Sequence, residues 1–459
     1  MRIGPVGSAI SFLALAAPSL AADGCAPGTN CLTVANNGGP GTGFTAQCAA
    51  RFPDFVFPAS GIPNNFPGPW FSLSQDYPAS AKAGDAPWLK IDFRKGVKEA
   101  NAYLYAMRDY SFEGMIEADF IPQKNPVRRW YHMPLMNFGK GAREPMRGLT
   151  QERPVTGPEL GLKPNVTINN YAVGFYNAPG GVTIGRVWKV SQPDLTKAQF
   201  PKGTMTFKIL FSDGKASDFS GPDPMAGAPE FNILTASGPK TVRLLQMDVS
   251  AVDSRSLTGW VFGTFAFQPN ATDPSPWKRL RPVGVSWGND PAYTPADQQA
   301  GKKLKQTIIS DEITDYAAKH LGWAGRTNGP VDNPVSGCLS CHGTAQWPVA
   351  ADLGPFASAC QTDQQKLWWF RNFKSPKSFG AMDKTTCQPA SGTRAPKTLD
   401  FSLQMQVAVQ SVLQFNDKNP CAPSTPPAAA PMAAARKSAP APPAYQDAPR
   451  IERGGTASN

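Results

Sequence analysis

The chain has 459 residues, of which 41% are hydrophobic and 17% charged, and it contains 47 Pro and 42 Gly. This composition excludes a long coiled coil and a compact helical bundle, which would be richer in Ala, Glu, Lys and Leu, and an aromatic content of 10% excludes a wholly disordered chain. The net charge of +11 favours acidic partners or anionic ligands, with solubility alone as the alternative.

Residues 1–21 have the pattern of a secretory signal. Arg2 supplies a short positive region, residues 9–17 are almost wholly apolar, and Ser19-Leu20-Ala21 places small residues where a signal peptidase cleaves. This apolar run is too short to span a bilayer, and no later run reaches about 18 apolar residues. The sequence therefore predicts an exported protein whose mature chain has no transmembrane segment.

Residues 22–86 are rich in turn-forming residues and contain Cys25, Cys31 and Cys48. Because disulfides persist outside the cytosol, we expect an irregular N-terminal segment pinned by disulfides.

Residues 87–290 have the pattern of short strands. Met205, Phe207, Ile209 and Phe211 alternate with other side chains, as in a strand with one buried face. Similar runs occupy residues 88–93, 112–121, 166–176, 182–190, 242–249 and 260–267. Strands at this spacing predict a mainly β domain, a sandwich or a jelly roll.

The rest of the chain divides into three parts. Residues 291–330 form a connecting segment with a short helix over 311–320. Residues 331–421 form a small α-helical domain with helices over 361–373 and 399–416. Residues 422–459 are rich in Pro and Ala and predict a disordered tail.

The segment Cys338-Leu339-Ser340-Cys341-His342 carries the most specific chemistry. Two Cys separated by two residues and followed by His form the attachment motif for c-type haem. Each thiol bonds to one vinyl group of the porphyrin, and the His nitrogen becomes the proximal iron ligand. The alternatives are a Cys338–Cys341 disulfide and half of a zinc site, but zinc needs four ligands and no second Cys-x-x-Cys or His pair is present.

On this motif, residues 331–421 resemble a monohaem c-type cytochrome domain. The whole layout is similar to that of bacterial periplasmic proteins of the cytochrome c family. The resemblance implies one covalently attached haem c, a periplasmic location and electron transfer. It also implies a soluble or membrane-bound redox partner, for which the basic chain favours an acidic surface, and no nucleic-acid partner.

The resemblance implies a distal Met in a loop before the last helix, a place that Met382 occupies. Asp383 stands where the family often has Pro. Met405, within the expected last helix, and His320 are the alternatives, and an open iron is a further one. The identity of the distal ligand matters because a Met ligand raises the reduction potential, whereas an open iron can bind a small molecule.

Two other groups of residues are candidate sites. Residues 124–153 are basic and surround His132, which predicts either a surface for docking an anion or partner, or a solvated loop around a structural His; the basic residues are Lys124, Arg128, Arg129, Lys140, Arg143, Arg147 and Arg153. Asp248, Asp253 and Asp290 are the weaker candidates for a pair of catalytic carboxylates.

Three functions remain open. The first is electron transfer, with the β domain docking a partner. The second is a haem c oxidoreductase whose β domain binds the substrate, and the third is a haem-containing binding or sensory module.

The pairing of the six cysteines outside the motif is also open. They are Cys25, Cys31, Cys48, Cys360, Cys387 and Cys421. If all of them pair, the odd number in each half of the chain requires a bridge between the halves. We expect Cys25–Cys31, with Cys48 bonded to one of the C-terminal three; free or intermolecular thiols are the alternative.

Overall fold

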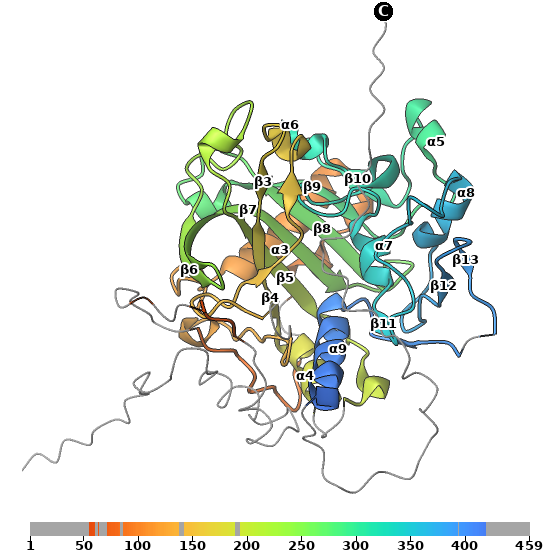
Figure 1. Cartoon of the computed structure of the whole chain (residues 1–459), viewed down its shortest axis with the longest axis horizontal. Helices are drawn as coiled ribbons and strands as arrows, with labels where there is room; N and C mark the ends of the chain where they lie inside the picture. The colour runs from red at the N-terminus through yellow and green to blue at the C-terminus, as the bar shows by residue number, and fades with distance from the viewer. Residues whose placement is uncertain are drawn as a thin grey trace, which may run out of the picture.

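The computed structural model describes residues 55–59, 63, 71–82, 86–136, 142–188, 193–392 and 394–418. The expected leader and tail lie outside these ranges. The centre of the protein is an eight-stranded antiparallel sheet (Figure 1). Its strands follow the order β1 (Thr150–Gln151), β4 (Asn170–Tyr176), β5 (Met205–Ser212), β7 (Gly238–Val252), β8 (Trp260–Phe267), β9 (Leu280–Ser286) and β10 (Thr307–Ile309), and β6 (Glu230–Thr235) pairs with β7.

The prediction of a mainly β protein is confirmed, and the runs over 205–211, 242–249 and 260–267 are strands. The remaining strands of the described residues form three two-stranded pairs: β2 (Val155–Thr156) with β3 (Thr167–Ile168), β11 (Gln346–Trp347) with β14 (Lys397–Thr398), and β12 (Met382–Asp383) with β13 (Gln388–Pro389). The described part of the chain thus contains one large sheet, without the second large sheet that a sandwich requires.

Helix α3 (Val97–Phe112) was not predicted from the sequence. Its buried residues Ala100, Tyr103, Leu104 and Met107 recur at helical spacing, a signal masked by the strand-like runs on either side. Both of those predicted strands are wrong. Residues 88–93 fall in the short helices η1 (Pro87–Lys90) and η2 (Phe93–Lys95), and residues 112–121 end α3 and continue as turns.

Helix α4 (Ala178–Val187) replaces the strand predicted over 182–190, of which residues 189 and 190 lie outside the described ranges. Asn177 caps the helix by accepting a hydrogen bond from the Gly180 backbone N–H at 3.3 Å. The β-branched residues resemble a strand, but the helix packs tightly: a Cβ on Gly181 would lie 2.8 Å from the Tyr131 ring. The glycine at position 181 therefore lets α4 pack closely against Tyr131; it does not mark a turn.

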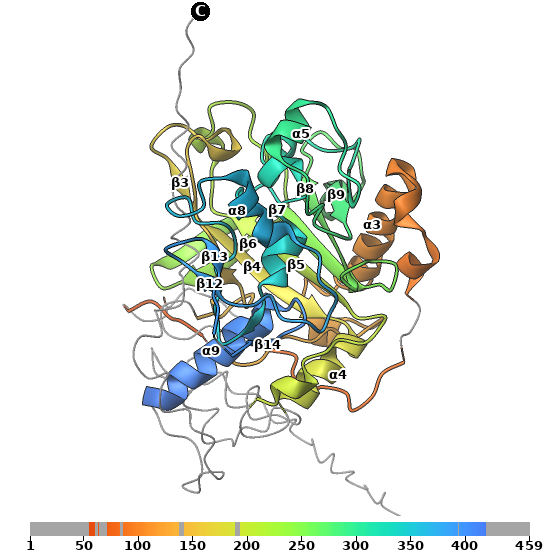
Figure 2. The same ribbon diagram turned by 90° about the vertical axis from the view of Figure 1, so that its right-hand side faces the viewer.

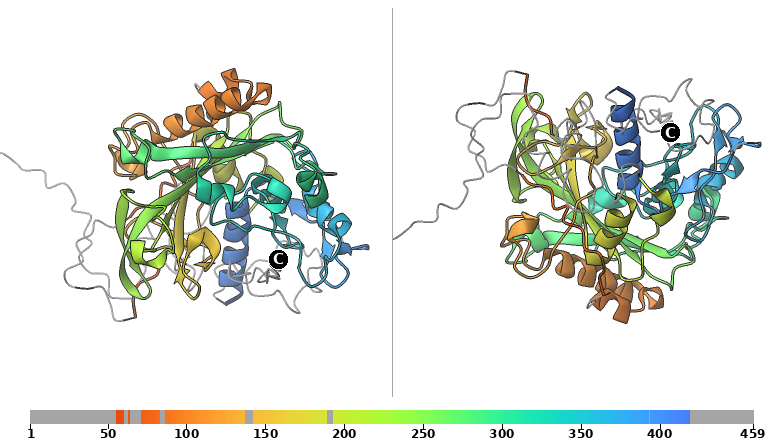
Figure 3. Two further views of the ribbon diagram at one scale, coloured as in Figure 1. Left: turned by 90° about the horizontal axis from the view of Figure 1, so that it is seen from above. Right: turned by 90° about the horizontal axis from the view of Figure 1, so that it is seen from below.

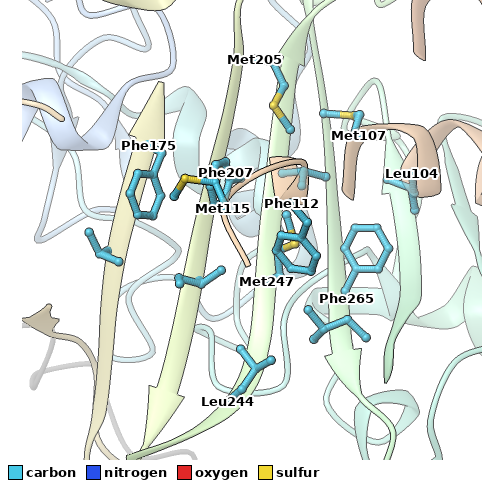
Figure 4. Packing of buried hydrophobic residues seen from close by; sticks show 14 of the residues in the cluster. Leu104, Met107, Phe112, Met115, Phe175, Met205, Phe207, Leu244, Met247 and Phe265 are labelled. Carbon is cyan, nitrogen blue, oxygen red and sulfur yellow. The ribbon is translucent and has the colours of Figure 1, made fainter. Parts of the chain in front are cut away.

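The two faces of the sheet are covered by different segments. Helix α3 covers one face, where Leu104 and Met107 pack with Phe207, Met247 and Phe265 (Figure 4). The opposite face is covered by residues 155–168 and 313–331 and by the C-terminal segment. Figures 2 and 3 show α3 and the C-terminal helices on opposite sides of the sheet. The sheet is therefore buried on both faces.

The C-terminal segment combines short helices with the pairs β11–β14 and β12–β13. Its helices are α7 (Cys338–Gly343), α8 (Asp363–Lys366), η10 (Leu367–Phe370) and α9 (Leu403–Lys418), and α5 (Pro295–Gln299), α6 (Asp315–Ala318) and η9 (Trp323–Gly325) precede them. The helices predicted over 361–373 and 311–320 are present but shorter. Leu339, Met405 and Val409 share an apolar cluster with Trp260 and Phe262 of the sheet, so this segment completes the core of the β region.

The remaining short 3-10 helices lie in connections: η3 (Pro122–Lys124), η5 (Glu159–Gly161), η6 (Leu195–Lys197), η7 (Ala216–Asp218) and η8 (Pro276–Arg279). Across the residues that the structure describes, no helix is long and apolar enough to cross a membrane.

The packing of α3 on the sheet can be tested at Gly263. A Cβ on this residue would lie 2.2 Å from Leu104 Cδ2. We expect Gly263→Ala to lower the free energy of unfolding by about 1–3 kcal/mol, and Leu104→Ala to lower it by about 2–5 kcal/mol. The double variant should lose less free energy of unfolding than the sum of the two single losses. The alanine at position 104 leaves room for the new methyl group at position 263. Unfolding in denaturant measures the free energy of unfolding of all three variants.

Gly221→Ala is the matched control, since a Cβ there would meet nothing within 4 Å. Strictly additive losses at positions 104 and 263 would contradict this packing.

Candidate functional site

Helix α7 places the two motif cysteines in its first turn. The Cys338 backbone N–H donates to the Thr327 carbonyl at 3.0 Å, and the Gly337 N–H donates to Ser340 Oγ at 3.0 Å. Leu339 and Ser340 are buried and hold the helix against the core. Residues separated by three or four positions share one face of a helix, so Cys338, Cys341 and His342 lie on a common face.

The imidazole of His342 is oriented by the segment that precedes α9. Its Nδ1 lies 3.0 Å from the carbonyl oxygen of Phe401, and its ring lies 4.7 Å from that of Phe262. A carbonyl oxygen only accepts, so Nδ1 carries the proton in this hydrogen bond. Burial lowers the pKa of His342 to about 4. The ring is therefore neutral at pH 7, and Nε2 is left as an unprotonated nitrogen.

The thiols of Cys338 and Cys341 are free, whereas Cys360 and Cys387 form a disulfide. Burial raises the pKa of Cys341 to about 12 and that of Cys338 well above its ordinary value. Both side chains are therefore protonated thiols at pH 7, and the two sulfurs are not joined in the alternative disulfide.

A group of charged side chains on the sheet lies near the same face of α7. Lys208 Nζ is 3.0 Å from Asp248 Oδ2 and 4.0 Å from Asp332 Oδ1. Gln246 Nε2 donates to both carboxylates, at 2.8 and 2.9 Å, and Thr264 Oγ1 donates to Asp248 at 2.6 Å. These residues, which we name the Lys208 cluster, join strands β5, β7 and β8 to the segment just before α7.

The charges of the Lys208 cluster act on Cys338 and His342, so the cluster and the motif lie close together. Burial is the leading cause of the raised pKa of Asp332 and of the shifts at Cys341 and His342, so these groups lie deep in the protein. The Asp332 side chain nevertheless keeps 28% of its surface accessible, and the two motif groups are partly accessible. A neutral imidazole beside two free thiols is the set of side chains that a covalently attached haem requires.

The candidate distal ligands lie in two places. Met382 (in β12) and Met405 (in α9) are buried in the apolar cluster that also contains Leu339 of α7. His320 follows α6, and its Nε2 accepts a hydrogen bond from the Leu160 backbone N–H at 2.9 Å. Binding of iron through this nitrogen would require that bond to break.

The basic segment over 124–153 is largely neutralised by ion pairs. Arg129 pairs with Asp76 at 2.5 Å and Arg147 with Asp119 at 2.6 Å. Arg128 pairs with Glu113 and Arg153 with Glu159, Arg143 is buried, and Lys140 lies outside the described residues. This arrangement supports the interpretation as a structural loop over that of an open surface for anions.

His132 is a core residue. It is fully buried, and its Nδ1 accepts a hydrogen bond from the Ser74 backbone N–H at 3.0 Å. Burial lowers its pKa well below the ordinary value, so the ring is neutral and structural.

The three aspartates proposed as paired carboxylates bond to separate partners. Asp248 belongs to the Lys208 cluster, Asp253 pairs with Arg255 at 2.5 Å, and Asp290 accepts from the Lys305 backbone N–H at 2.6 Å. This arrangement does not support a shared catalytic site.

The sequence did not predict the Lys208 cluster or the hydrogen bond from His342 to the Phe401 carbonyl oxygen. Lys208 alternates with the residues of β5 that face α3, so it lies on the opposite face of the sheet, which the C-terminal segment covers. A pattern of alternation does not reveal what covers the polar face.

Comparison of this chain with known proteins identified no relative. Neither the models of protein families, nor the curated proteins, nor the solved structures contain a match to this chain. Within the described ranges, no three side chains of His, Cys, Asp or Glu gather into a group that could hold a metal ion.

The Cys360–Cys387 disulfide narrows the pairing of the other cysteines. Cys25, Cys31, Cys48 and Cys421 remain, and all four lie outside the described residues. If they all pair, Cys421 must bond to one of the N-terminal three. We expect peptide mapping without reduction to find Cys360–Cys387, Cys25–Cys31 and Cys48–Cys421. A bridge from Cys360 or Cys387 to the N-terminal segment would contradict this arrangement.

Proposed function

We propose that this protein is an exported monohaem c-type cytochrome that transfers electrons in the periplasm. The observation that carries the proposal is the geometry of His342. The Phe401 carbonyl accepts the Nδ1 proton at 3.0 Å, so that Nε2 is available on the helix face that also bears two free thiols. We further propose that residues 331–421 serve as the cytochrome c-like part of the chain.

The residues of the chain have separate roles in this proposal. Cys338 and Cys341 would each hold the haem through one carbon–sulfur bond to a vinyl group, with the thiol hydrogen passing to the other vinyl carbon. His342 supplies the proximal nitrogen. The haem, when bound, supplies one-electron oxidation and reduction. The sheet holds α7 through its shared apolar cluster. The net charge of +11 favours a redox partner with acidic groups.

The first test is the attachment of haem. Protein expressed with a haem c maturation system should retain haem after denaturation and give a pyridine haemochrome spectrum of two thioether bonds. Cys338→Ala/Cys341→Ala should lose all covalent haem. Cys360→Ala/Cys387→Ala is the matched control: it also removes two cysteines but should keep the haem. Extraction of the haem from the wild-type protein by acid–acetone would refute the proposal.

The second test concerns the distal ligand, for which we propose Met382. Met382→Ala should remove the charge-transfer band of Met-ligated ferric haem and lower the reduction potential, because a thioether ligand favours the ferrous state. Met405→Ala and His320→Ala should retain the band. If the band survives Met382→Ala and disappears in Met405→Ala, Met405 is the ligand. A wild-type spectrum without the band would exclude both Met residues and leave His320 or an open iron.

A haem c oxidoreductase is the second candidate, and the Lys208 cluster favours it. Electron transfer alone does not require a lysine and two carboxylates beside the haem site, whereas a substrate that exchanges protons could use them. Absence of the Met band in the wild-type protein, together with a spectral change on adding imidazole, would indicate an open iron. That result would favour the oxidoreductase.

A further inference from the structure

Two consecutive residues before α9 adopt an unusual backbone conformation. Asp400 and Phe401 have φ angles of 49° and 64°, in the left-handed region that residues other than glycine seldom occupy. This conformation is unfavourable for residues with a side chain, so the surrounding structure must hold the turn in place. The Leu399 N–H donates to the Ala345 carbonyl at 3.0 Å, which ties the turn to the end of the haem motif helix.

The Asp400 carboxylate supplies most of the remaining restraint. Its Oδ2 accepts from the Phe200 backbone N–H at 2.6 Å, and its Oδ1 accepts from Trp260 Nε1 at 3.0 Å and from Ser375 Oγ. The side chain is buried, with 1% of the residue exposed. One carboxylate therefore joins strand β8, the segment before β5 and the loop after η10.

The position of this carboxylate in the chain gives it a further role. Asp400 immediately precedes Phe401, whose carbonyl accepts the Nδ1 proton of His342. If the turn relaxed, this carbonyl would rotate away from the imidazole. A hydrogen bond from the free N–H of a metal-bound histidine fixes the ring and raises the basicity of the ligating nitrogen.

We infer that Asp400 is a positioning residue for the proximal histidine: by holding the Phe401 carbonyl against His342, it sets the donor strength of Nε2 and thereby lowers the haem reduction potential. This inference rests on the proposed haem function. Asp400 lies 58 positions beyond His342 in the chain. In this inference Asp400 acts on the redox equilibrium without contacting the haem iron.

Asp400→Asn is the first variant to examine. An amide offers a single acceptor oxygen, so it cannot satisfy the donors on both sides of the turn. We expect covalent haem to be retained, because both thiols remain. The equilibrium between the reduced and oxidised forms should shift about tenfold towards the reduced form, which corresponds to a rise of about 59 mV. The iron–histidine stretching band, read in the reduced Met382→Ala background where the sixth ligand is removed, should fall in frequency, and the His342 Nδ1 proton should exchange faster.

Ser375→Ala separates positioning from charge. Asp400→Asn also removes a negative charge, which alone favours the reduced form. Ser375→Ala keeps the carboxylate but removes one donor to it, and we expect a smaller change in the same three measurements. Asp253→Asn is the control: it alters another buried carboxylate, which bonds to Tyr103 and Arg255 rather than to this turn. Its potential should stay at the wild-type value.

The outcomes distinguish this inference from the proposed function. If wild-type protein binds no covalent haem, the proposed function fails. If haem-loaded Asp400→Asn and Ser375→Ala both keep the wild-type iron–histidine band and proton exchange rate, Asp400 does not position His342, whatever the potential does. If Asp400→Asn does not fold, Ser375→Ala decides by the same measurements, and unchanged values overturn the inference.

Discussion

The hydrogen bond between His342 and the Phe401 carbonyl is the contact on which the candidate site depends. It joins residues 59 positions apart and brings the start of the C-terminal segment to its end. Without it, the imidazole of α7 would have no fixed tautomer, and the free nitrogen would not be confined to the face of the two thiols. The turn that supplies this carbonyl is anchored on Trp260 of β8, so the large sheet fixes the geometry of the motif.

This anchoring explains why the site and the sheet belong to one packed structure. Trp260 and Phe262 of β8 contribute to the apolar cluster that also holds Leu339 of α7 and Val409 of α9. Strand β8 is buried along its whole length because α3 covers one face and the C-terminal segment the other. A change in β8 should therefore affect both the stability of the protein and the environment of His342.

Local patterns in the sequence predicted the mainly β class and the strands over 205–211, 242–249 and 260–267. They failed where local preference and packing disagree. The β-branched residues of 182–187 resemble a strand, but Asn177 caps a helix there, and glycines allow it to approach Tyr131. The Lys208 cluster and the carboxylate of Asp400 could not be predicted, because their partners lie up to 200 positions away in the chain.

The Cys360–Cys387 disulfide has a consequence for ligand exchange. Its two cysteines are separated by 27 positions, and Met382 lies within the loop that they close. A loop anchored at both ends has few open conformations, so a side chain on it that leaves a binding position returns quickly. For a methionine bound to iron, this anchoring would shorten the time spent detached and limit competition from small molecules. The redox state of the surrounding compartment would then govern how often the sixth position opens.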